Sequence, residues 1–497
     1  MAPDLSDTAG ALAAQVHETH TGLVLLVGDR AYKCKKPVVT DFLDFSTVEL
    51  REQACTRELT LNGRLSPQAY LGIAHLDGPQ PGTREPVLVM RRYPDAQRLS
   101  TRVNDPEIDA AALAGEITSV ACILADFHAE GHRGIEVDAE ATPAAVARRW
   151  SANITEMRPF TTAVLSAGLL DEVAALVQQY VDGRAALFIG RIDERRIVDG
   201  HADLLAGDIF CTADGPVLLD CLDFDDRLRY VDGLDDAAFL AMDLEFLGRG
   251  ELAAQFLTDY RERAADTAPA SLADFYVAYR AGVRAKVDCI RVAQGHPEAA
   301  DDAARHLHIA ADHLRAATIR LVLVGGGPGT GKTTVSRGVA ENIGAQVIST
   351  DDVRRDLVDQ QVICGAVGIV EQGLYAPENV ATVYDEVLRR AQALLAGGWS
   401  VVLDGTWRDD AQRRCVRELA AQSHAALTEL QCVTTLADAQ DRIAARTVTT
   451  SDATPDIAAA LAAGTGTGSD GWREAHLLDT GRAAATVVGE ATELCTR

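Results

Sequence analysis

The sequence is short of positive charge, of paired cysteines and of long apolar runs, and each shortage argues against a class of protein. Its 497 residues include 47 Lys and Arg against 73 Asp and Glu, a formal net charge of −26. Nucleic acids and anionic membranes repel such a chain, so neither is expected as a general partner. No run of about 18 consecutive apolar residues occurs, so no membrane-spanning helix is expected.

The cysteines and the first residues indicate where the protein works. The ten cysteines are scattered singly, without a CxxC pair. In a chain of this size that pattern indicates reduced thiols and not a disulfide framework or a zinc site. The start, MAPDLSDTAG, has neither the basic nor the apolar region of a secretion signal. We therefore expect a cytoplasmic protein without a membrane partner, and its oligomeric state stays open.

Length and composition favour more than one globular domain. Hydrophobic residues make up 47% and charged residues 24%, a profile typical of chains that form cores. An Ala-rich helical stretch near residue 315 precedes residues 319–324, an apolar strand that runs into glycines. Such runs are typical of parallel strands in α/β folds. We predict a first domain at 1–315 and a second at 318–497.

The strongest motif is a phosphate loop in the second half. Residues 326–333 fit the pattern G-x-x-x-x-G-K-[ST] between a predicted strand and a predicted helix, which is the context that the motif needs. Glycine amides and the helix N-terminus can hold phosphates. A lysine can neutralise their oxygens, and a threonine hydroxyl can ligate Mg²⁺. The predicted ATP-binding residues are Gly326, Gly327, Pro328, Gly329, Thr330, Gly331, Lys332, Thr333 and Thr334, with Thr333 also a metal ligand.

An acid follows the phosphate loop at the end of the next predicted strand, residues 347–351. Asp351 can accept a proton from an attacking hydroxyl, or it can simply cap the helix that follows. Arg354 lies three residues further on, so both side chains share a face if a helix begins there.

Two further features of this half suit phosphate transfer. The apolar segment 399–404 ends in Asp404, which is placed to hold Mg²⁺ through water. Arg442 and Arg446 are four residues apart and so share a helix face. They either close over the transferring phosphate as a lid or lie on a solvated surface, where charged pairs are common.

This half resembles the P-loop kinase family that contains polynucleotide 5′-kinases and zeta-toxin-type sugar-nucleotide kinases. The shared features are the phosphate loop, Asp351 with Arg354, Asp404 followed by Gly-Thr, and the segment with Arg442 and Arg446. The resemblance implies an α/β P-loop domain with a parallel sheet. It also implies that Asp351 orients or deprotonates an acceptor hydroxyl and that Arg354 helps to hold the acceptor.

Three aspartates in the first half have the spacing of another transfer site. Asp203 follows His201, Asp208 comes five residues later, and Asp220 ends a predicted hairpin. A site of the protein-kinase kind needs a base, a metal ligand five residues on, and a second metal acid from the next strand.

The N-terminal residues can supply the cationic part of such a site. Residues 22–27 and 31–35, joined by a Gly-Asp turn, predict a hairpin. Lys33 and Lys35 lie on one face of its second strand, and the sequence does not choose between them. Glu58 lies on a predicted helix that begins at Ser46, where Ser46 and Glu49 match a capping box. A Lys–Glu pair of this kind would anchor phosphates of ATP.

These residues resemble the aminoglycoside phosphotransferase and small-molecule kinase family over about residues 20–290. The resemblance implies a two-lobed, kinase-like α+β domain with ATP between the lobes. Asp203 would be the base, Asp208 and Asp220 the Mg²⁺ ligands, and Asp232 and Asp236 structural acids.

Two positions depart from that family pattern. Leu205 stands where the family has a second His, and Asp208 stands where it has a metal-binding Asn. Asp also suits Mg²⁺, but close carboxylates raise one another's pKa values unless a metal is present. A degenerate site that binds nucleotide weakly is therefore an alternative for the first half.

The combination looks like a bacterial family of two-domain ATP-binding proteins. We predict an ATP- and Mg²⁺-dependent phosphotransferase with two nucleotide sites that acts on a hydroxyl of a small molecule, whose identity the sequence does not reveal. One alternative is a nucleotide-responsive regulatory or binding protein. Another is a polynucleotide 5′-kinase, against which the net charge of −26 argues because that acceptor needs a basic channel.

Overall fold

The computed structural model describes residues 14–18, 21–39, 43–77, 84–366, 372–445 and 472–496. The chain forms two compact units. The first comprises Met1–Asp171, Gly190–Ala268 and Ala273–His313, and the second comprises Glu172–Ile189, Pro269–Leu272 and Leu314–Arg497. Residues 172–189 thus pack with the second unit, although they precede it in the chain and no sequence pattern indicated this grouping. The domain boundaries at 1–315 and 318–497 stay a prediction.

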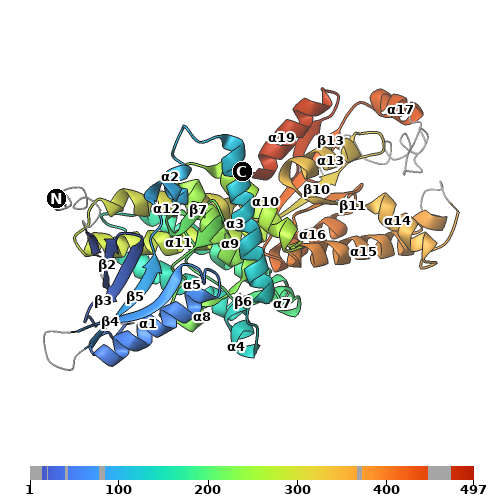
Figure 1. Ribbon diagram of the computed structural model, residues 1–497. Helices are drawn as coiled ribbons and strands as arrows, with labels where there is room; N and C mark the ends of the chain where they lie inside the picture. Colours follow the sequence, from blue (N-terminus) through green and yellow to red (C-terminus); the bar gives the residue numbers. More distant parts are fainter. Residues whose placement is uncertain are drawn as a thin grey trace, which may run out of the picture. The chain divides into compact units, whose positions relative to one another are not determined.

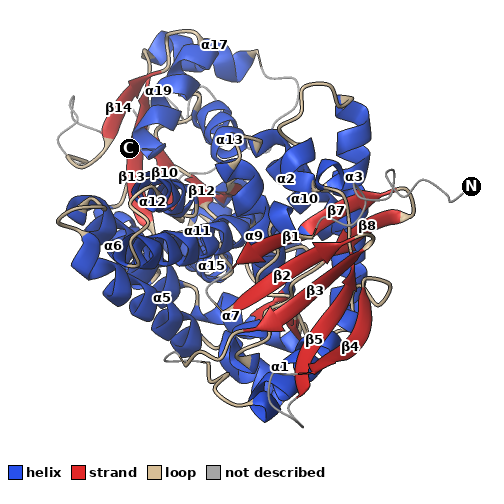
Figure 2. Cartoon of the chain, turned by 60° about the vertical axis from the view of Figure 1, so that its left-hand side comes forward, coloured by secondary structure: helices blue, strands red, loops and turns tan. Residues whose placement is uncertain are grey.

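The first unit begins with an antiparallel sheet in the order β1-β2-β3-β5-β4 (Figures 1 and 2). The predicted hairpin is β2 and β3, which pair Lys33 with Val24 and Lys35 with Gly22. Helix α1 packs against β4 and β5. The elements are β1 (Gln15–Glu18), β2 (Gly22–Val27), β3 (Arg30–Lys35), α1 (Val48–Gly63), β4 (Tyr70–Asp77) and β5 (Arg84–Arg91).

The predicted capping box at the start of α1 is wrong by one residue. Thr47 is the N-cap, and its hydroxyl accepts a hydrogen bond of 3.3 Å from the Leu50 amide. Ser46 is instead part of the preceding turn, where its amide donates to Asp44 Oδ1 at 2.9 Å. Serine and threonine are both favoured N-caps, so residue type alone did not fix the position.

Helices make up most of the rest of the first half of the chain. Two short antiparallel ribbons, β6 with β9 and β7 with β8, lie among them and carry the loops that contain Asp203 and Asp220. The elements are α2 (Leu99–Arg102), α3 (Ala110–Glu130), α4 (Ile135–Asp138), α5 (Pro143–Met157), α6 (Ala167–Gly183), α7 (Ala185–Asp193), β6 (Ile197–Asp199), β7 (Ile209–Thr212), β8 (Gly215–Leu218), α8 (Asp226–Arg229), β9 (Tyr230–Asp232), α9 (Gly233–Phe246), α10 (Gly250–Arg263), α11 (Ala270–Ala293) and α12 (Ala299–Ala316).

Among the residues that the structure describes, α3 is the one helix long and apolar enough to cross a membrane by length and composition. Core helices pass the same test. One side of α3 is buried, through residues such as Leu113, Ile117 and Leu124, and the helix packs against α10.

The second unit is built on a parallel sheet in the order β11-β12-β10-β13-β14. Side chains of β10 alternate between two cores. Leu321 and Leu323 lie in the core with α14, α15 and α16, while Val322 and Val324 lie in the core with α13 and α19. The elements are β10 (Arg320–Gly325), α13 (Lys332–Ile343), β11 (Gln346–Ser349), α14 (Thr350–Asp359), α15 (Pro377–Ala396), β12 (Val401–Asp404), α16 (Asp410–Gln422), β13 (Ala426–Val433), α17 (Leu436–Ala444), β14 (His476–Asp479) and α19 (Ala484–Thr496).

The buried guanidinium of Arg184 attaches residues 172–189 to the second unit. It donates to the carbonyl of Leu395 at the end of α15, and to the carbonyl of Ser423 after α16 at 2.6 Å. Burial lowers the pKa of Arg184 to about 10. One side chain therefore satisfies the C-terminal carbonyls of two helices.

The predicted fold class is confirmed. An α+β unit with a sheet-rich lobe and a larger helical part is followed along the chain by an α/β unit with a parallel sheet. In the second unit a glycine-rich loop joins β10 to α13, as the phosphate-loop motif requires.

Candidate phosphate-transfer sites

The phosphate loop of the second unit needs glycine for two separate reasons. Gly326, Gly329 and Gly331 have φ values of 143°, 78° and 85°, which L side chains rarely adopt. A Cβ at Gly326 would also lie 2.5 Å from the carbonyl oxygen of Cys432, and one at Gly329 would overlap the backbone of Ala439. The loop therefore passes close to neighbouring backbone at two points.

Polar groups of the loop fold back on its own carbonyls. Lys332 Nζ donates to Gly327 O at 3.0 Å, and the Thr330 hydroxyl donates to the same oxygen at 2.8 Å. The Thr334 amide donates to Gly331 O at 3.1 Å in the first turn of α13. Lys332 thus holds its ammonium group over the loop, where phosphate oxygens bind in proteins with this motif.

Thr333 and Asp404 meet beside the loop. The Thr333 hydroxyl donates to Asp404 Oδ2 at 2.8 Å, and Asp404 ends β12, opposite Val324 of β10. Burial raises the pKa of Asp404, while the charge of Lys332 and the bond from Thr333 lower it. Hydroxyl and carboxylate oxygens are the groups that hold Mg²⁺ in proteins.

The predicted place of Asp351 at the end of a strand is wrong, because this residue lies in the first turn of helix α14. Strand β11 ends at Ser349, whose hydroxyl caps α14 by accepting a bond of 3.2 Å from the Asp351 amide. Arg354 donates to Asp351 Oδ1 at 2.8 Å, so the two side chains share a face as expected. The guanidinium also lies 4.5 Å from the ring centre of Tyr375. The charge of Asp351 reaches Asp404, whose pKa it raises.

Arg442 lies beside the phosphate loop, on α17. It donates to Thr480 O at 2.7 Å, and the Thr480 hydroxyl donates to Thr330 O at 2.7 Å. Arg446 falls outside the described residues. The sequence did not single out Thr480, although it directly follows β14, a strand that runs parallel to β12 with its terminal Asp404 in the same sheet.

In the first unit, two lysines share one carboxylate. Lys33 Nζ lies 2.7 Å from Glu58 Oε1, and Lys35 Nζ lies 2.6 Å from Glu58 Oε2. The Glu58 side chain is 1% exposed. Burial opposes the charge on Lys33, but Asp220 and Glu58 outweigh it and raise the pKa of Lys33.

Each lysine also contacts an aspartate from the segment after β8. Lys33 Nζ lies 2.9 Å from Asp220 Oδ1, and Lys35 Nζ lies 3.3 Å from Asp223 Oδ2. The charge of Lys33 lowers the pKa of Asp220. Asp223 was not among the predicted site residues, although residues 222–223 repeat the Leu-Asp pair of residues 219–220.

The pKa values of Asp203 and Asp208 are raised, whereas that of Asp220 is lowered. Burial raises the pKa of Asp203 to about 7, against the charges of Arg284 and Arg280. Burial, followed by the charges of Asp220 and Asp203, raises the pKa of Asp208 well above its usual range. The three acids therefore do not titrate alike, because Lys33 keeps Asp220 ionised.

Asp236 supports the segment that carries Asp203. Its carboxylate accepts from the amides of His201 at 2.6 Å and Ala202 at 2.7 Å, and from His128 Nε2 at 2.8 Å. Although burial opposes it, the hydrogen bond from His128 and the charge of that ring lower the pKa of Asp236.

Within the described part of the chain, no group of three or more His, Cys, Asp or Glu side chains is arranged to hold a metal ion. Mg²⁺ usually takes one or two carboxylates and completes its shell with water and substrate phosphates. The oxygen groups of Asp208 with Asp220, and of Thr333 with Asp404, fit that kind of site.

Comparisons with known proteins find one family model and a close full-length relative. Residues 321–465 match the family model of the AAA domain. The chain is 55% identical over 476 residues to the protein Rv2004c of Mycobacterium tuberculosis, covering 96% of this chain and 94% of that one.

Two solved structures are similar to parts of the chain. A choline/ethanolamine kinase family protein from Mesorhizobium loti is 17% identical, covering 62% of this chain and 94% of its own, with a TM-score of 0.37. The APS kinase CysC of Mycobacterium tuberculosis is 18% identical, covering 36% and 97%, with a TM-score of 0.26.

Proposed function

We propose that this chain, which belongs to the family of the mycobacterial protein Rv2004c, is an ATP- and Mg²⁺-dependent phosphotransferase whose acceptor is a hydroxyl group of a small molecule. The observation that carries the proposal is the contact of 2.8 Å between Thr333 and Asp404 beside the glycine loop. A loop that needs glycine, a lysine over it and two oxygen groups at its edge are the parts of a triphosphate site.

In the second unit each residue has a distinct task. Loop amides and Lys332 bind phosphate oxygens, and Arg442 adds positive charge beside the loop. Mg²⁺, when bound by Thr333 and Asp404, would neutralise charge on the β- and γ-phosphates. Asp351 would accept the hydroxyl proton as the oxygen forms its bond to the γ-phosphorus and the bond to the leaving ADP breaks.

Arg354 has a positioning task in this scheme. Its bond to Asp351 and its contact with Tyr375 fix the carboxylate on the first turn of α14. A base held in one direction contributes more than a mobile one, because the geometry of attack is set before reaction.

The first unit would hold a second nucleotide site. Lys33 would bind phosphate in preference to Lys35, because it contacts both Glu58 and the proposed metal ligand Asp220. Asp203 would act as the base, and its pKa of about 7 suits that task near neutral pH. Asp208 would complete the metal site.

The test is transfer of labelled γ-phosphate from ATP into a pooled extract of small metabolites. We expect a labelled product with the intact chain. Loss of that product in Asp351→Asn alone would assign transfer to the second unit, and loss in Asp203→Asn alone would assign it to the first. Asp352→Asn is the matched control, since Asp352 neighbours Asp351 but pairs with Arg355.

A second candidate is a nucleotide-responsive regulatory protein. The raised pKa of Asp208 favours it, because a protonated carboxyl is a poor Mg²⁺ ligand. ATP binding and slow hydrolysis without any labelled product in the extract would support this function in place of transfer.

A further inference from the structure

The backbone that carries Asp220 is held at every amide from Leu218 to Leu222. Two of these amides donate to the proposed catalytic segment: Leu219 to Asp208 O at 3.0 Å, and Leu222 to His201 O at 3.1 Å. The other three donate to side chains from α1 and the residues that follow it. The segment is thus fixed from two directions.

Three side chains, Asn62, Ser66 and Tyr70, provide the second set of contacts. Ser66 Oγ accepts from the Leu218 amide at 3.2 Å and donates to the Leu218 carbonyl at 2.8 Å. Tyr70 Oη accepts from the Asp220 amide at 3.1 Å, and Asn62 Oδ1 accepts from the Cys221 amide at 2.8 Å. Asn62 and Ser66 are each 1% exposed.

Asn62 also contacts the helix turn that bears Glu58. Its Nδ2 donates to the Glu58 carbonyl at 3.0 Å. One buried amide therefore joins the residue beside Asp220 to the residue that pairs with Lys33. Both ends of this link belong to the first phosphate site.

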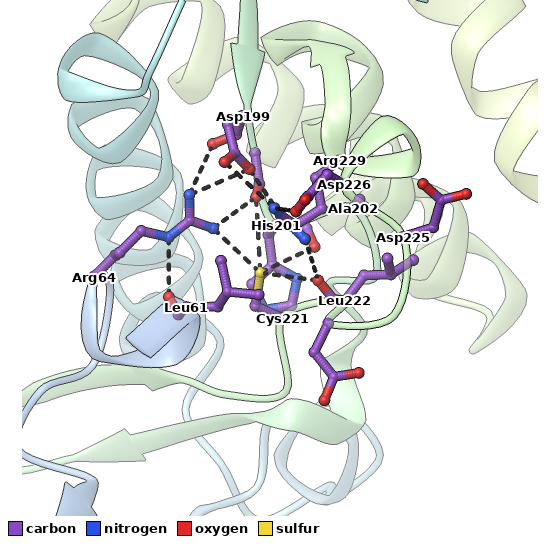
Figure 3. Close-up of polar contacts among 12 residues, drawn as sticks. Leu61, Arg64, Asp199, His201, Ala202, Cys221, Leu222, Asp225, Asp226 and Arg229 are labelled. Atoms are coloured by element: carbon purple, nitrogen blue, oxygen red, sulfur yellow. Dashed lines mark hydrogen bonds and ion pairs between the residues drawn. The ribbon is translucent and has the colours of Figure 1, made fainter. Parts of the chain in front are cut away.

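Arg64 strengthens the same junction (Figure 3). Its guanidinium lies between the end of α1 and the loop segments, donating to Leu61 O at 3.0 Å, Gly200 O at 3.2 Å and Cys221 Sγ at 3.4 Å. The end of α1 thus contacts the segments that carry both Asp203 and Asp220.

Asp220 needs such support because its backbone is strained. Its φ is 63°, a left-handed value that costs a residue other than glycine about 1 kcal/mol or more. The next amide, that of Cys221, donates to Asn62 and so holds the chain in this left-handed turn. Without Asn62 a buried N–H would be left without a partner, and the backbone could relax out of the turn.

We propose that Asn62 is a positioning residue of the first site, which fixes the backbone of Asp220 so that its carboxylate can hold Mg²⁺. The inference rests on the proposed function, and it adds a residue that acts through the backbone of a metal ligand and not through contact with metal or nucleotide. Groups that orient metal ligands typically affect metal affinity about 10- to 100-fold.

The test is the Mg²⁺ dependence of ATP binding, measured by titration calorimetry on the full chain carrying Lys332→Ala to weaken the second site. Asn62→Leu removes both hydrogen bonds at similar size. We expect the half-saturating Mg²⁺ concentration to rise about tenfold, while ATP binding in EDTA stays unchanged. Ser66→Ala, a milder change, should move the same quantity in the same direction.

Asn153→Leu is the matched control, since Asn153 is also a buried asparagine of the first unit, 4% exposed. Equal Mg²⁺ requirements in Asn62→Leu and this control would overturn the inference alone. Equal loss of binding with and without Mg²⁺ in Asn62→Leu would also overturn it, since that result is general destabilisation. No ATP binding in the Lys332→Ala parent would overturn the proposed first site, and the inference with it.

Discussion

The hydroxyl of Thr333 and the carboxylate of Asp404 are in contact at 2.8 Å, although 71 residues separate them along the chain. The contact arises because β10 and β12 are parallel neighbours, so the loop after one strand meets the last residue of the other. Two oxygen groups thereby stand together before any ligand is bound.

Thr333→Val should weaken Mg²⁺-dependent ATP binding at the second site by about 10- to 100-fold. Valine keeps the shape of threonine but leaves Asp404 without its hydroxyl partner. The measurement is ATP affinity at saturating and at zero Mg²⁺ in a chain carrying Lys33→Met. The control is Thr382→Val, which should change neither affinity. Thr382 lies on α15, and its hydroxyl donates a hydrogen bond to the Glu378 carbonyl.

The two lysines of β3 should differ in their effect on nucleotide binding. Lys33→Met is expected to reduce ATP affinity at the first site by about tenfold or more, because charge-assisted bonds are worth about 1.5–3 kcal/mol. Lys35→Met should reduce it less, since Lys35 contacts Asp223 in place of Asp220. Binding titrations in the Lys332→Ala background measure both. A larger effect of Lys35→Met would reverse the assignment.

Transfer at the first site should rise with pH through about 7. Burial raises the pKa of Asp203 to about 7, and a general base works only in its ionised form. The rate should therefore fall about tenfold for each pH unit below 7 and level off above it. The pH profile of labelled product, with Asp351→Asn present to silence the second site, measures this. A flat profile between pH 5 and 8 would contradict the role of Asp203.

His313 should stabilise the protein in acid more than in alkali. Burial opposes its charge, but the hydrogen bonds that its ring nitrogens donate to Asp274 at 2.8 Å and to Glu245 at 2.7 Å raise the pKa of His313 to about 9. Because the folded pKa is raised, the stabilisation is complete below about 6.5 and is lost as the pH rises through about 9. His313→Gln should cost about 1–3 kcal/mol at pH 6 and much less at pH 10. Urea unfolding at both pH values measures the difference, and an equal cost would refute it.

Arg184→Met should destabilise the second unit by about 2–4 kcal/mol, since buried acceptors left without a partner cost about 1–3 kcal/mol each. Methionine fills the space but cannot donate to the carbonyls of Leu395 and Ser423. The thermal unfolding of the second unit, followed by hydrogen exchange at the end of α15, measures the change. Arg315→Met is the control, because Arg315 pairs with Glu172 in an exposed ion pair of little expected value. Similar losses in both variants would argue against the capping role.

Some features of the fold were predictable because they depend on local patterns. The hairpin of β2 and β3, the phosphate loop and the strand before Asp404 each have a periodicity or motif that few other structures fit. The end of the strand before Asp351 was predicted two residues too late, because the sequence does not show that Ser349 caps α14 and that the helix begins at Thr350. Element ends depend on single hydrogen bonds, which a sequence pattern does not determine.

The supporting contacts were not predictable for a different reason. Asn62, Ser66 and Tyr70 are ordinary residues at the end of α1, in the turn after it and at the start of β4, and their partners lie about 150 residues away. The packing of residues 172–189 with the second unit depends on a buried arginine that has no motif. The proposed preference for Lys33 over Lys35 likewise rests on the contact of Lys33 with Asp220.

The contacts of the buried Asp236 carboxylate affect how mutational screens of this protein should be interpreted. From α9 it accepts hydrogen bonds from the amides of His201 and Ala202, yet Asp236 lies 33 residues from Asp203 in the sequence and is 0% exposed. A random screen for dead variants would therefore recover Asp236 and its partner His128 as readily as Asp203. A ranking of positions by loss of activity alone would therefore misidentify Asp236, a buried structural residue, as one that contacts the substrate.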